Sequence, residues 1–319
     1  MRVVALVPGG VSEQLLFIPT LDDLKRYYPD TEVDVVVEPQ SMGAYRVSQS
    51  VRDVLRFDFK DRNSLADWGN LLGVIRDREY DVVISLGQSW LLGLLLWMTG
   101  IPTRIGHQGS GEIFLTNPVP LKSEQYIAAM NHDLLQGLGI NVSACPELAI
   151  NVPKPDIDWA EREQKRLAVQ ESGYVLIYGG AGVAQAKVID KIYPFESWRQ
   201  IIQDFQKRQP DLPVVVVQGA EDEQLVQEVL QSCPGVQTTA PTDIGKLAAM
   251  IAGANLLLCT DNATMQLAVA VQTYTIGLFG STESLKLLPQ SERFLTIKSS
   301  TTKIADIPPQ VVMERVWSA

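Results

Sequence analysis

Four glycine- or acid-rich segments hold the residues of this chain whose types and spacing suit them to chemistry. The first is Gly9-Gly10-Val11-Ser12-Glu13, which follows an apolar run and places a carboxylate at the start of a helix-like pattern. The glycines allow a positive φ and let a ligand approach the backbone closely. An acidic residue at this point also complements the helix dipole, which contributes about 0.3–1 kcal/mol. Taken alone, the segment favours this structural role of Glu13 over a catalytic one.

A second glycine-rich segment reads GGAG at residues 179–182, directly after the apolar run YVLIY, and Lys191 follows it. Successive N–H groups of such a turn can cradle a phosphate, and a lysine adds a positive charge. The segment matches neither G-x-G-x-x-G nor G-x-x-x-x-G-K-S/T, so dinucleotide-binding and P-loop sites have weak support. A plain strand-to-helix turn with a solvated lysine explains the same residues about equally well.

A third segment, GAEDE at residues 219–223, places carboxylates just after a strand-like run. A carboxylate at this point can accept two hydrogen bonds from a ribose diol. Acidic residues that open the next helix are the more ordinary explanation, and the local pattern favours it.

The fourth segment, TDNAT at residues 260–264, ends a strand-like run and opens the apolar stretch MQLAVAV. Asp261 or Asn262 suits the N-cap position of a helix. Since the start of a helix is also a natural anion site, the segment fits a structural and a binding role together.

Short runs of β-branched residues alternate with longer helical patterns around these segments. In the first half the runs are RVVALVP, EVDVVVE and YDVVISLG. Continuous Val and Ile runs are typical of parallel strands that helices cover on both faces. Residues 15–24 carry a helical stripe of leucine and isoleucine in spite of Pro19, and residues 126–138 predict a further helix.

Residues 151–167 interrupt this alternation with two prolines and a charged helix, which indicates an interdomain linker. The second half repeats the pattern with YVLIYGGAG, LPVVVVQGA, ANLLLCTD and TYTIGLFG. We therefore predict an α/β fold of two doubly wound, Rossmann-like domains, residues 1–155 and 156–319, that face each other across a cleft. Ligands of such sheets bind beyond the carboxyl ends of the strands, where the four segments lie.

The overall composition argues against several other functions. The 319 residues carry a net charge of −10 without a block rich in lysine or arginine, which disfavours a nucleic-acid binder. Three widely spaced cysteines fit neither a disulfide framework nor a zinc site and favour a reducing cytoplasm. With two histidines and no G-x-S-x-G motif, a Ser-His-Asp hydrolase has little support. The DID sequence at residues 156–158 lies in the linker, and we expect no required metal.

The most apolar window is SWLLGLLLWMTG at residues 89–100, and the N-terminus shows no signal-peptide pattern. This window is shorter than the roughly 20 residues that a membrane-spanning helix needs. We expect a buried helix here, and a helix that rests on a membrane surface is the alternative.

Taken in order, these segments resemble glycosyltransferase family 9, the family of lipopolysaccharide heptosyltransferases. The resemblance extends over nearly the whole chain, and its most specific parts are GGVSEQLLFIPTLDDLKRYYP, GAGVAQAKVIDKIYP and CTDNATMQLAVAVQTYTIGLFGSTES. It implies the GT-B fold, with an N-terminal domain that binds the acceptor and a C-terminal domain that binds the nucleotide sugar. It also implies inversion of the anomeric carbon without a metal or other cofactor, and a C-terminal helix that can pack back on the N-terminal domain.

The resemblance assigns roles to individual residues. The family's first-loop aspartate, proposed as the general base, falls on Glu13, and Gly9, Gly10 and Ser12 accompany it on the acceptor side. The family's diphosphate-binding lysine falls on Lys191, and its ribose-binding glutamate falls on Glu223. All donor-side residues implied in this way are Gly180, Ala181, Gly182, Lys191, Glu223, Asp261, Asn262, Ala263, Thr264 and Gln266.

Three positions depart from the family pattern, because Ser12 and Ala263 replace glycines and Gln266 replaces a histidine. These exchanges point to a different donor or acceptor, or to reduced activity. The resemblance favours an ADP-sugar donor, carrying heptose or a hexose-like sugar, and a saccharide or lipid-linked saccharide acceptor. It places the enzyme in the cytoplasm, where a peripheral contact with the inner face of the membrane is compatible with the window at 89–100. Two alternatives stay open: a nucleotide-sugar epimerase or hydrolase of the same fold, and a non-catalytic nucleotide-sugar-binding protein.

Overall fold

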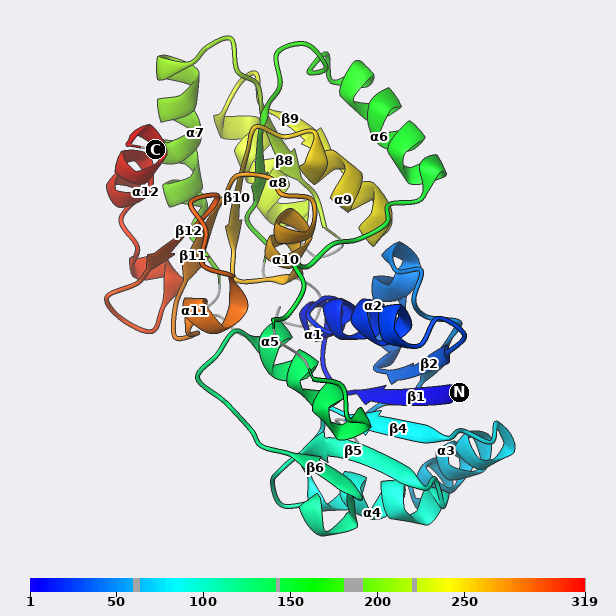
Figure 1. The fold of residues 1–319 in the computed structure, drawn as a ribbon. Helices are drawn as coiled ribbons and strands as arrows, with labels where there is room; N and C mark the ends of the chain where they lie inside the picture. The colour runs from blue at the N-terminus through cyan, green and yellow to red at the C-terminus, as the bar shows by residue number, and fades with distance from the viewer. Residues whose placement is uncertain (60–63, 142–143, 181–191, 220–222, 319) are drawn as a thin grey trace. The chain divides into compact units, whose positions relative to one another are not determined.

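The computed structural model of the chain describes residues 1–59, 64–141, 144–180, 192–219 and 223–318. The chain forms two compact units, Met1–Asn151 and Val152–Ala319, which are described separately below. The sequence predicted a division after residue 155, within the first turns of the helix that opens the second unit. Figure 1 labels the helices and strands of both units.

The first unit is built on a parallel six-stranded sheet in the order β3-β2-β1-β4-β5-β6. The register pairs Val3 of β1 with Val33 of β2 and with Val82 of β4. The strands are β1 (Arg2–Val7), β2 (Glu32–Val37), β3 (Asp53–Arg56), β4 (Val82–Ser85), β5 (Thr103–His107) and β6 (Asn117–Val119).

Helices cover both faces of this sheet, and Figure 1 shows α1 and α2 on one side and α3 and α4 on the other. Alternate residues of β1 enter two separate cores, Val3 and Ala5 on one face and Val4 and Leu6 on the other. This explains why the strand reads as a continuous apolar run. The helices are α1 (Val11–Leu15), α2 (Ile18–Tyr27), η1 (Pro39–Val47), α3 (Leu65–Asp77), α4 (Trp90–Thr99), η2 (Glu112–Phe114), α5 (Ile127–His132) and η3 (Asp133–Leu138).

The apolar stripe at residues 15–24 belongs to two helices and not to one. α1 ends at Leu15 and α2 begins at Ile18, so that Pro19 lies in the first turn of the second helix. Proline is tolerated there because the N–H that it lacks has no partner within the helix. The helix predicted for residues 126–138 is likewise divided into α5 and the 3₁₀ helix η3.

The second unit repeats the same topology in the strand order β12-β11-β10-β7-β8-β9. All of its strand pairs are parallel, and the register places Cys259 of β10 opposite Tyr178 of β7. The strands are β7 (Val175–Tyr178), β8 (Val214–Val217), β9 (Gln237–Thr239), β10 (Leu256–Thr260), β11 (Thr275–Phe279) and β12 (Phe294–Lys298). Two doubly wound, Rossmann-like sheets are therefore confirmed.

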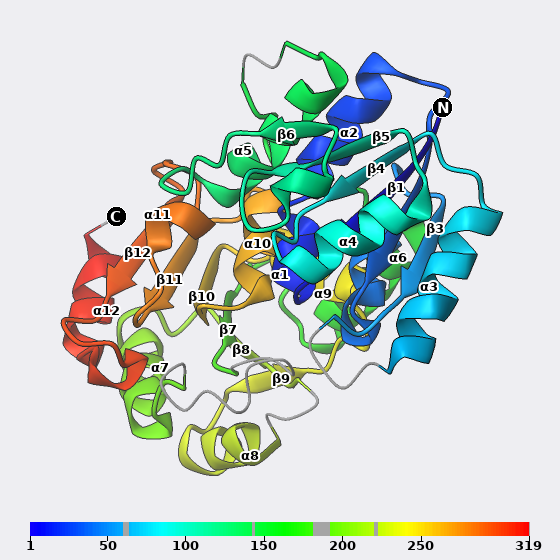
Figure 2. The same cartoon turned by 90° about the horizontal axis from the view of Figure 1, so that it is seen from below.

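Figure 2 shows α7 and α8 on one side of the second sheet, where Trp198, Phe205 and Val226 enter its core. The C-terminal helix α12 contacts α7, and the Trp317 indole donates to the Asp204 carboxylate at 2.6 Å. The sequence had suggested that this helix can pack on the N-terminal domain. The helices are α6 (Lys154–Arg166), α7 (Phe195–Arg208), α8 (Glu223–Ser232), α9 (Ile244–Ala252), α10 (Ala263–Ala270), α11 (Ser284–Leu287), η5 (Ile304–Asp306) and α12 (Pro309–Trp317).

Three further expectations can be compared with the structure. Asp156, part of the DID sequence, lies inside α6 and is buried against α9, where it faces Gly245. The three cysteines, all within the described ranges, are free thiols. The window at 89–100 forms α4, which is buried on one face only. Among the described residues, no helix is long and apolar enough to cross a membrane.

Candidate active site

The first glycine-rich loop follows β1, and Gly179 and Gly180, the described part of the second, follow β7, the equivalent strand of the second sheet. In the first unit the chain continues from β1 through β2 and β3 on one side of the sheet, and then crosses to β4 on the other side of β1. β1 and β4 therefore flank the point where the strand order reverses. β7 and β10 flank the same point in the second unit. In open parallel sheets ligands bind outside the carboxyl ends of the strands at this point. The first and fourth segments therefore lie where such sheets bind ligands, as do Gly179 and Gly180 of the second segment.

Glu13 lies at the start of α1 and folds back over the loop that follows β1. Its exposed side chain accepts a hydrogen bond from the Gly10 N–H at 2.8 Å. Gly9 has a φ of 122°, and a Cβ atom there would lie 2.8 Å from Cγ of Glu13. A side chain at position 9 would therefore be strained and would displace the carboxylate. The hydrogen bond matches the structural role considered for Glu13, and the exposed carboxylate leaves room for a chemical one.

Three buried side chains hold this loop, and none of them was singled out from the sequence. The Gln14 amide nitrogen donates to the Val7 carbonyl at 2.9 Å, and its oxygen accepts from the Tyr45 hydroxyl at 3.0 Å. Ser41 donates to the Gly9 carbonyl at 3.0 Å. Complete burial raises the pKa of the Tyr45 hydroxyl, which therefore stays a neutral donor. Ser41 and Tyr45 come from η1, a segment whose sequence shows no periodic pattern.

In the second unit Asn262 joins the loops that follow β7 and β10. Its amide nitrogen donates to the Gly180 carbonyl at 3.0 Å, and Thr260 donates to the same carbonyl at 3.0 Å. The Asn262 side-chain oxygen accepts from the Thr264 N–H at 2.9 Å, which confirms Asn262 as the N-cap of α10. Both loops at the switch point are thus held together by buried polar groups.

Asp261 and Gln266 connect α10 to the segment after β11. Thr282 donates to the Asp261 carboxylate at 2.6 Å, and the Gln266 amide donates to the Leu287 carbonyl at 3.3 Å. Ala263 and Thr264 form the first turn of α10, where N–H groups favour an anion. The structure thus brings Gly180 and the residues from Asp261 to Gln266 together at one end of the sheet.

Of the remaining predicted donor residues, the structure describes Glu223. Glu223 is the first residue of α8 and is exposed, as an acid that opens a helix would be. Ala181, Gly182 and Lys191 lie outside the described residues. Ser12, on the acceptor side, is the second residue of α1 and is partly buried.

The first unit also contains a pocket of about 540 Å³, which the sequence did not predict. It lies at the carboxyl end of β3, where Arg56, Phe57 and Asp58 face Asn70 and Leu71 of α3. The lining combines a cation, two carboxylates and an amide with apolar side chains, while the Phe57 ring is buried against Phe59 and Trp68. Such a lining suits a ligand that carries hydroxyl groups.

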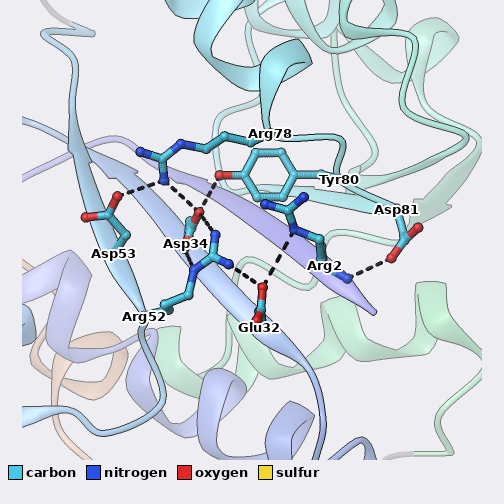
Figure 3. A network of polar contacts seen from close by, with 8 residues as sticks. All are labelled: Arg2, Glu32, Asp34, Arg52, Asp53, Arg78, Tyr80 and Asp81. Carbon is cyan, nitrogen blue, oxygen red and sulfur yellow. Dashed lines mark hydrogen bonds and ion pairs between the residues drawn. The ribbon is translucent and has the colours of Figure 1, made fainter.

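A polar network closes the opposite, amino end of the first sheet (Figure 3). The buried Asp34 carboxylate accepts hydrogen bonds from Arg52 at 2.5 Å, from Tyr80 at 2.6 Å and from Arg78 at 2.8 Å. Burial alone would raise the pKa of Asp34, but these hydrogen bonds outweigh it and hold that pKa below its ordinary value. Because ligands bind at the carboxyl ends, this network is structural.

Comparison with known proteins identifies the family of the chain. The family model described as glycosyltransferase family 9 (heptosyltransferase) matches residues 68–314. An Arabidopsis thaliana protein, photosynthetic NDH subunit of subcomplex B 1, is 26% identical over 96% of this chain and 71% of its own length. Lipopolysaccharide heptosyltransferase 3 of Escherichia coli is 24% identical over 89% of this chain and 84% of its own length.

Solved structures share the fold over the whole chain. A family 9 glycosyltransferase from Veillonella parvula has a TM-score of 0.82 at 17% identity, covering 99% of this chain and 96% of its own. The E. coli heptosyltransferase WaaC with ADP-2-deoxy-2-fluoro heptose has a TM-score of 0.74 at 16% identity, covering 100% and 99%. These matches confirm the GT-B fold, with its two Rossmann-like domains.

Proposed function

The chain belongs to glycosyltransferase family 9 (heptosyltransferase), and on that premise we propose how its two units carry out glycosyl transfer. The second unit binds a nucleotide diphosphate sugar, and the first unit binds a saccharide or lipid-linked saccharide acceptor. The acceptor hydroxyl replaces the nucleotide diphosphate with inversion of the anomeric carbon and without a metal. The observation that carries this proposal is that the Gly9-Gly10 loop after β1 and the Gly180–Asn262 contact after β7 and β10 lie at equivalent switch points of the two sheets.

On the donor side, negative charge builds on the leaving diphosphate, and fixed donors lower the barrier most where charge develops. The start of α10 supplies the backbone N–H of Ala263, while the Thr264 N–H donates to Asn262, which fixes this turn to the Gly180 loop. Lys191 adds the positive charge in this proposal, and Glu223 binds the ribose. Asp261, which accepts from Thr282, holds the neighbouring segment and donor hydroxyls.

On the acceptor side, Glu13 acts as the general base. Its carboxylate is exposed at the carboxyl end of β1, and the Gly10 N–H holds it there. The carboxylate removes the proton of the acceptor hydroxyl while that oxygen forms the bond to the anomeric carbon. The pocket lined by Arg56, Asp58 and Asn70 lies at the same end of the sheet and binds hydroxyl groups of the acceptor.

The donor is an ADP-sugar and the sugar is a heptose or a close hexose-like relative. Support comes from the family and from the structure of WaaC with an ADP-heptose analogue. The nucleotide sugar is a substrate, and the proposed reaction needs no cofactor.

A panel of nucleoside diphosphates and nucleotide sugars tests the donor half, scored by the rise in unfolding temperature. A ligand at a hundredfold excess over its dissociation constant stabilises the folded state by about 2.7 kcal/mol. We expect ADP and ADP-sugars to give a selective rise that Lys191→Ala and Glu223→Ala reduce. Lys207→Ala, at an unrelated site near the end of α7, is the matched control. No rise with any member of the panel would contradict the proposal.

A second candidate function is a non-catalytic subunit of a larger complex. Two observations favour it: the Arabidopsis relative is named as a subunit of a complex, and this chain carries Ala263 and Gln266 in place of family residues. A protein of this kind binds a nucleotide sugar or nothing and transfers no sugar. Donor consumption without an acceptor would instead indicate a hydrolase or epimerase.

A further inference from the structure

One face of α4 is apolar and exposed, although it belongs to a well-packed helix. This face consists of four large side chains, which we call the α4 stripe: Trp90 (52% exposed), Leu91 (49%), Trp97 (58%) and Met98 (41%). Residues at these spacings share one face of a helix. The opposite face of α4, with Leu92, Leu95 and Leu96, is buried in the core of the first unit.

The orientation of α4 is fixed by close backbone packing. A Cβ atom on Gly93 would lie 2.7 Å from the Gly111 carbonyl oxygen, so the segment that carries η2 lies directly against the helix. The Trp90 ring meets the Phe114 ring edge-on, with the centroids 5.5 Å apart. Ile113, on η2, exposes 76% of its surface and adds to the apolar area. The stripe therefore faces solvent because its helix is held in this position.

Charge is absent from the stripe itself, and charges of both signs border it, with the exposed Glu112 on η2 and two arginines near the C-terminal end of α4. Residues 82–103 contain no acidic or basic residue, in a chain with a net charge of −10. At the C-terminal end of α4, Arg76 donates to the Met98 carbonyl at 3.1 Å and Arg104 donates to the Ile101 carbonyl at 2.6 Å. Both guanidinium groups are thus used at the end of the helix, and it is the uncharged face rich in tryptophan that matches the interface of a phospholipid bilayer, where tryptophan is enriched.

The size of the stripe argues against a stable protein partner. A ten-residue helix is about 15 Å long and about 10 Å across, so one face of it covers about 150 Å². A stable protein interface buries about 800 Å² on each side, which is several times more. A bilayer needs no matching surface and accepts a few apolar side chains. We propose that the α4 stripe docks on a phospholipid surface, with the helix lying in the plane of the membrane. This inference does not depend on the transfer reaction.

The test is flotation of the full chain with vesicles of phosphatidylcholine. We expect the wild type to float with the vesicles, and added salt not to release it, because the contact is apolar. The double substitution Leu91→Ser and Trp97→Ser should lower the bound-to-free ratio by about tenfold or more. Leu65→Ser, which removes a leucine that is 92% exposed on α3, is the matched control and should float like the wild type.

A second measurement tests the proposal if the double variant does not fold. Lipids brominated on their acyl chains should quench the tryptophan fluorescence of the wild type, and Trp97→Phe should still bind but be quenched less. A wild type that does not float would overturn the proposal, as would a double variant that folds and floats normally. A concentration-dependent dimer that the double substitution abolishes, without vesicle binding, would assign the stripe to a second copy of the chain and also overturn it.

Discussion

At the scale of single residues, the first loop answers why a carboxylate follows two glycines. Gly9 has a backbone conformation that favours glycine, and the Glu13 side chain occupies the space beside it. The Gly10 N–H then holds the carboxylate at the end of β1. Sequence reasoning identified the glycines and the acid because glycine preferences are local. It missed Gln14, Ser41 and Tyr45, because their hydrogen bonds join segments that are distant in the sequence.

Substitution of Gly9 by alanine tests this arrangement. A Cβ atom at a φ of 122° is strained and collides with Glu13, so we expect a loss of about 1–3 kcal/mol of unfolding free energy. Transfer activity should fall further than stability alone explains. Gly43→Ala is the control, since a Cβ atom there meets nothing within 4 Å. Equal behaviour of the two variants in denaturant titration and in transfer would contradict the account.

Tyr45 is expected to act as a positioning residue for the Glu13 loop. Tyr45→Phe leaves the Gln14 side-chain oxygen without its donor, and we expect kcat to fall several-fold while the KM for the donor is unchanged. Tyr80→Phe removes a comparable buried hydroxyl from Asp34 at the opposite end of the same sheet. Both variants should lose about 1–3 kcal/mol of stability, and only the first should lose kcat. Similar kcat values in the two variants would argue against positioning.

At the scale of elements, the sequence predicted the strands in the middle of each sheet and missed β3, β6, β9 and β12. Continuous Val and Ile runs identify buried parallel strands because both faces are covered, and each quoted run contains a strand. The apolar stripe through Pro19 was assigned to one helix, because periodicity does not show a break that a proline accommodates. The exposure of one face of α4 was also not predictable, since all its residues are apolar or small and the pattern has no polar side.

The link from α10 to the segment after β11 should govern donor affinity. Thr282→Val removes the hydrogen bond to Asp261, and we expect the dissociation constant for the nucleotide sugar to rise about tenfold, measured by calorimetry. Thr282→Ser keeps a hydroxyl and should restore most of the affinity. If valine and serine bind the donor equally, this segment has no part in the donor site.

At the scale of the whole molecule, two copies of one topology carry different polar residues at the same end of the sheet. The repeated order of strands predicts where ligands bind in each unit. The choice of ligand depends on side chains such as Glu13 in one unit and Asn262 in the other, which the fold does not dictate. The predicted cleft concerns the placement of the units, and it stays a prediction from the two alternating halves of the sequence.

The Asp34 network should make the first unit sensitive to acid. The pKa of Asp34 is lowered in the folded state, so its stabilisation is complete above the unfolded pKa of about 3.9 and is lost as pH falls below that value. Asp34→Asn should cost about 3 kcal/mol at pH 7 and weaken the pH dependence of unfolding in this acid range. Asp77→Asn, on the exposed end of α3, is the control. Unchanged stability of Asp34→Asn at pH 7 would show that the network contributes little.

The most direct test of the central claim is transfer of labelled heptose from ADP-heptose to a panel of saccharides derived from lipopolysaccharide. We expect a product with an inverted anomeric centre from the wild type and a rate about 10²–10⁴-fold lower for Glu13→Gln, because the general base is lost. Glu112→Gln, an exposed acid on η2, should retain the full rate. A Glu13→Gln variant as active as the wild type would contradict the assignment of the base. A wild type that binds ADP-heptose and transfers it to no acceptor would contradict glycosyl transfer and favour a binding subunit.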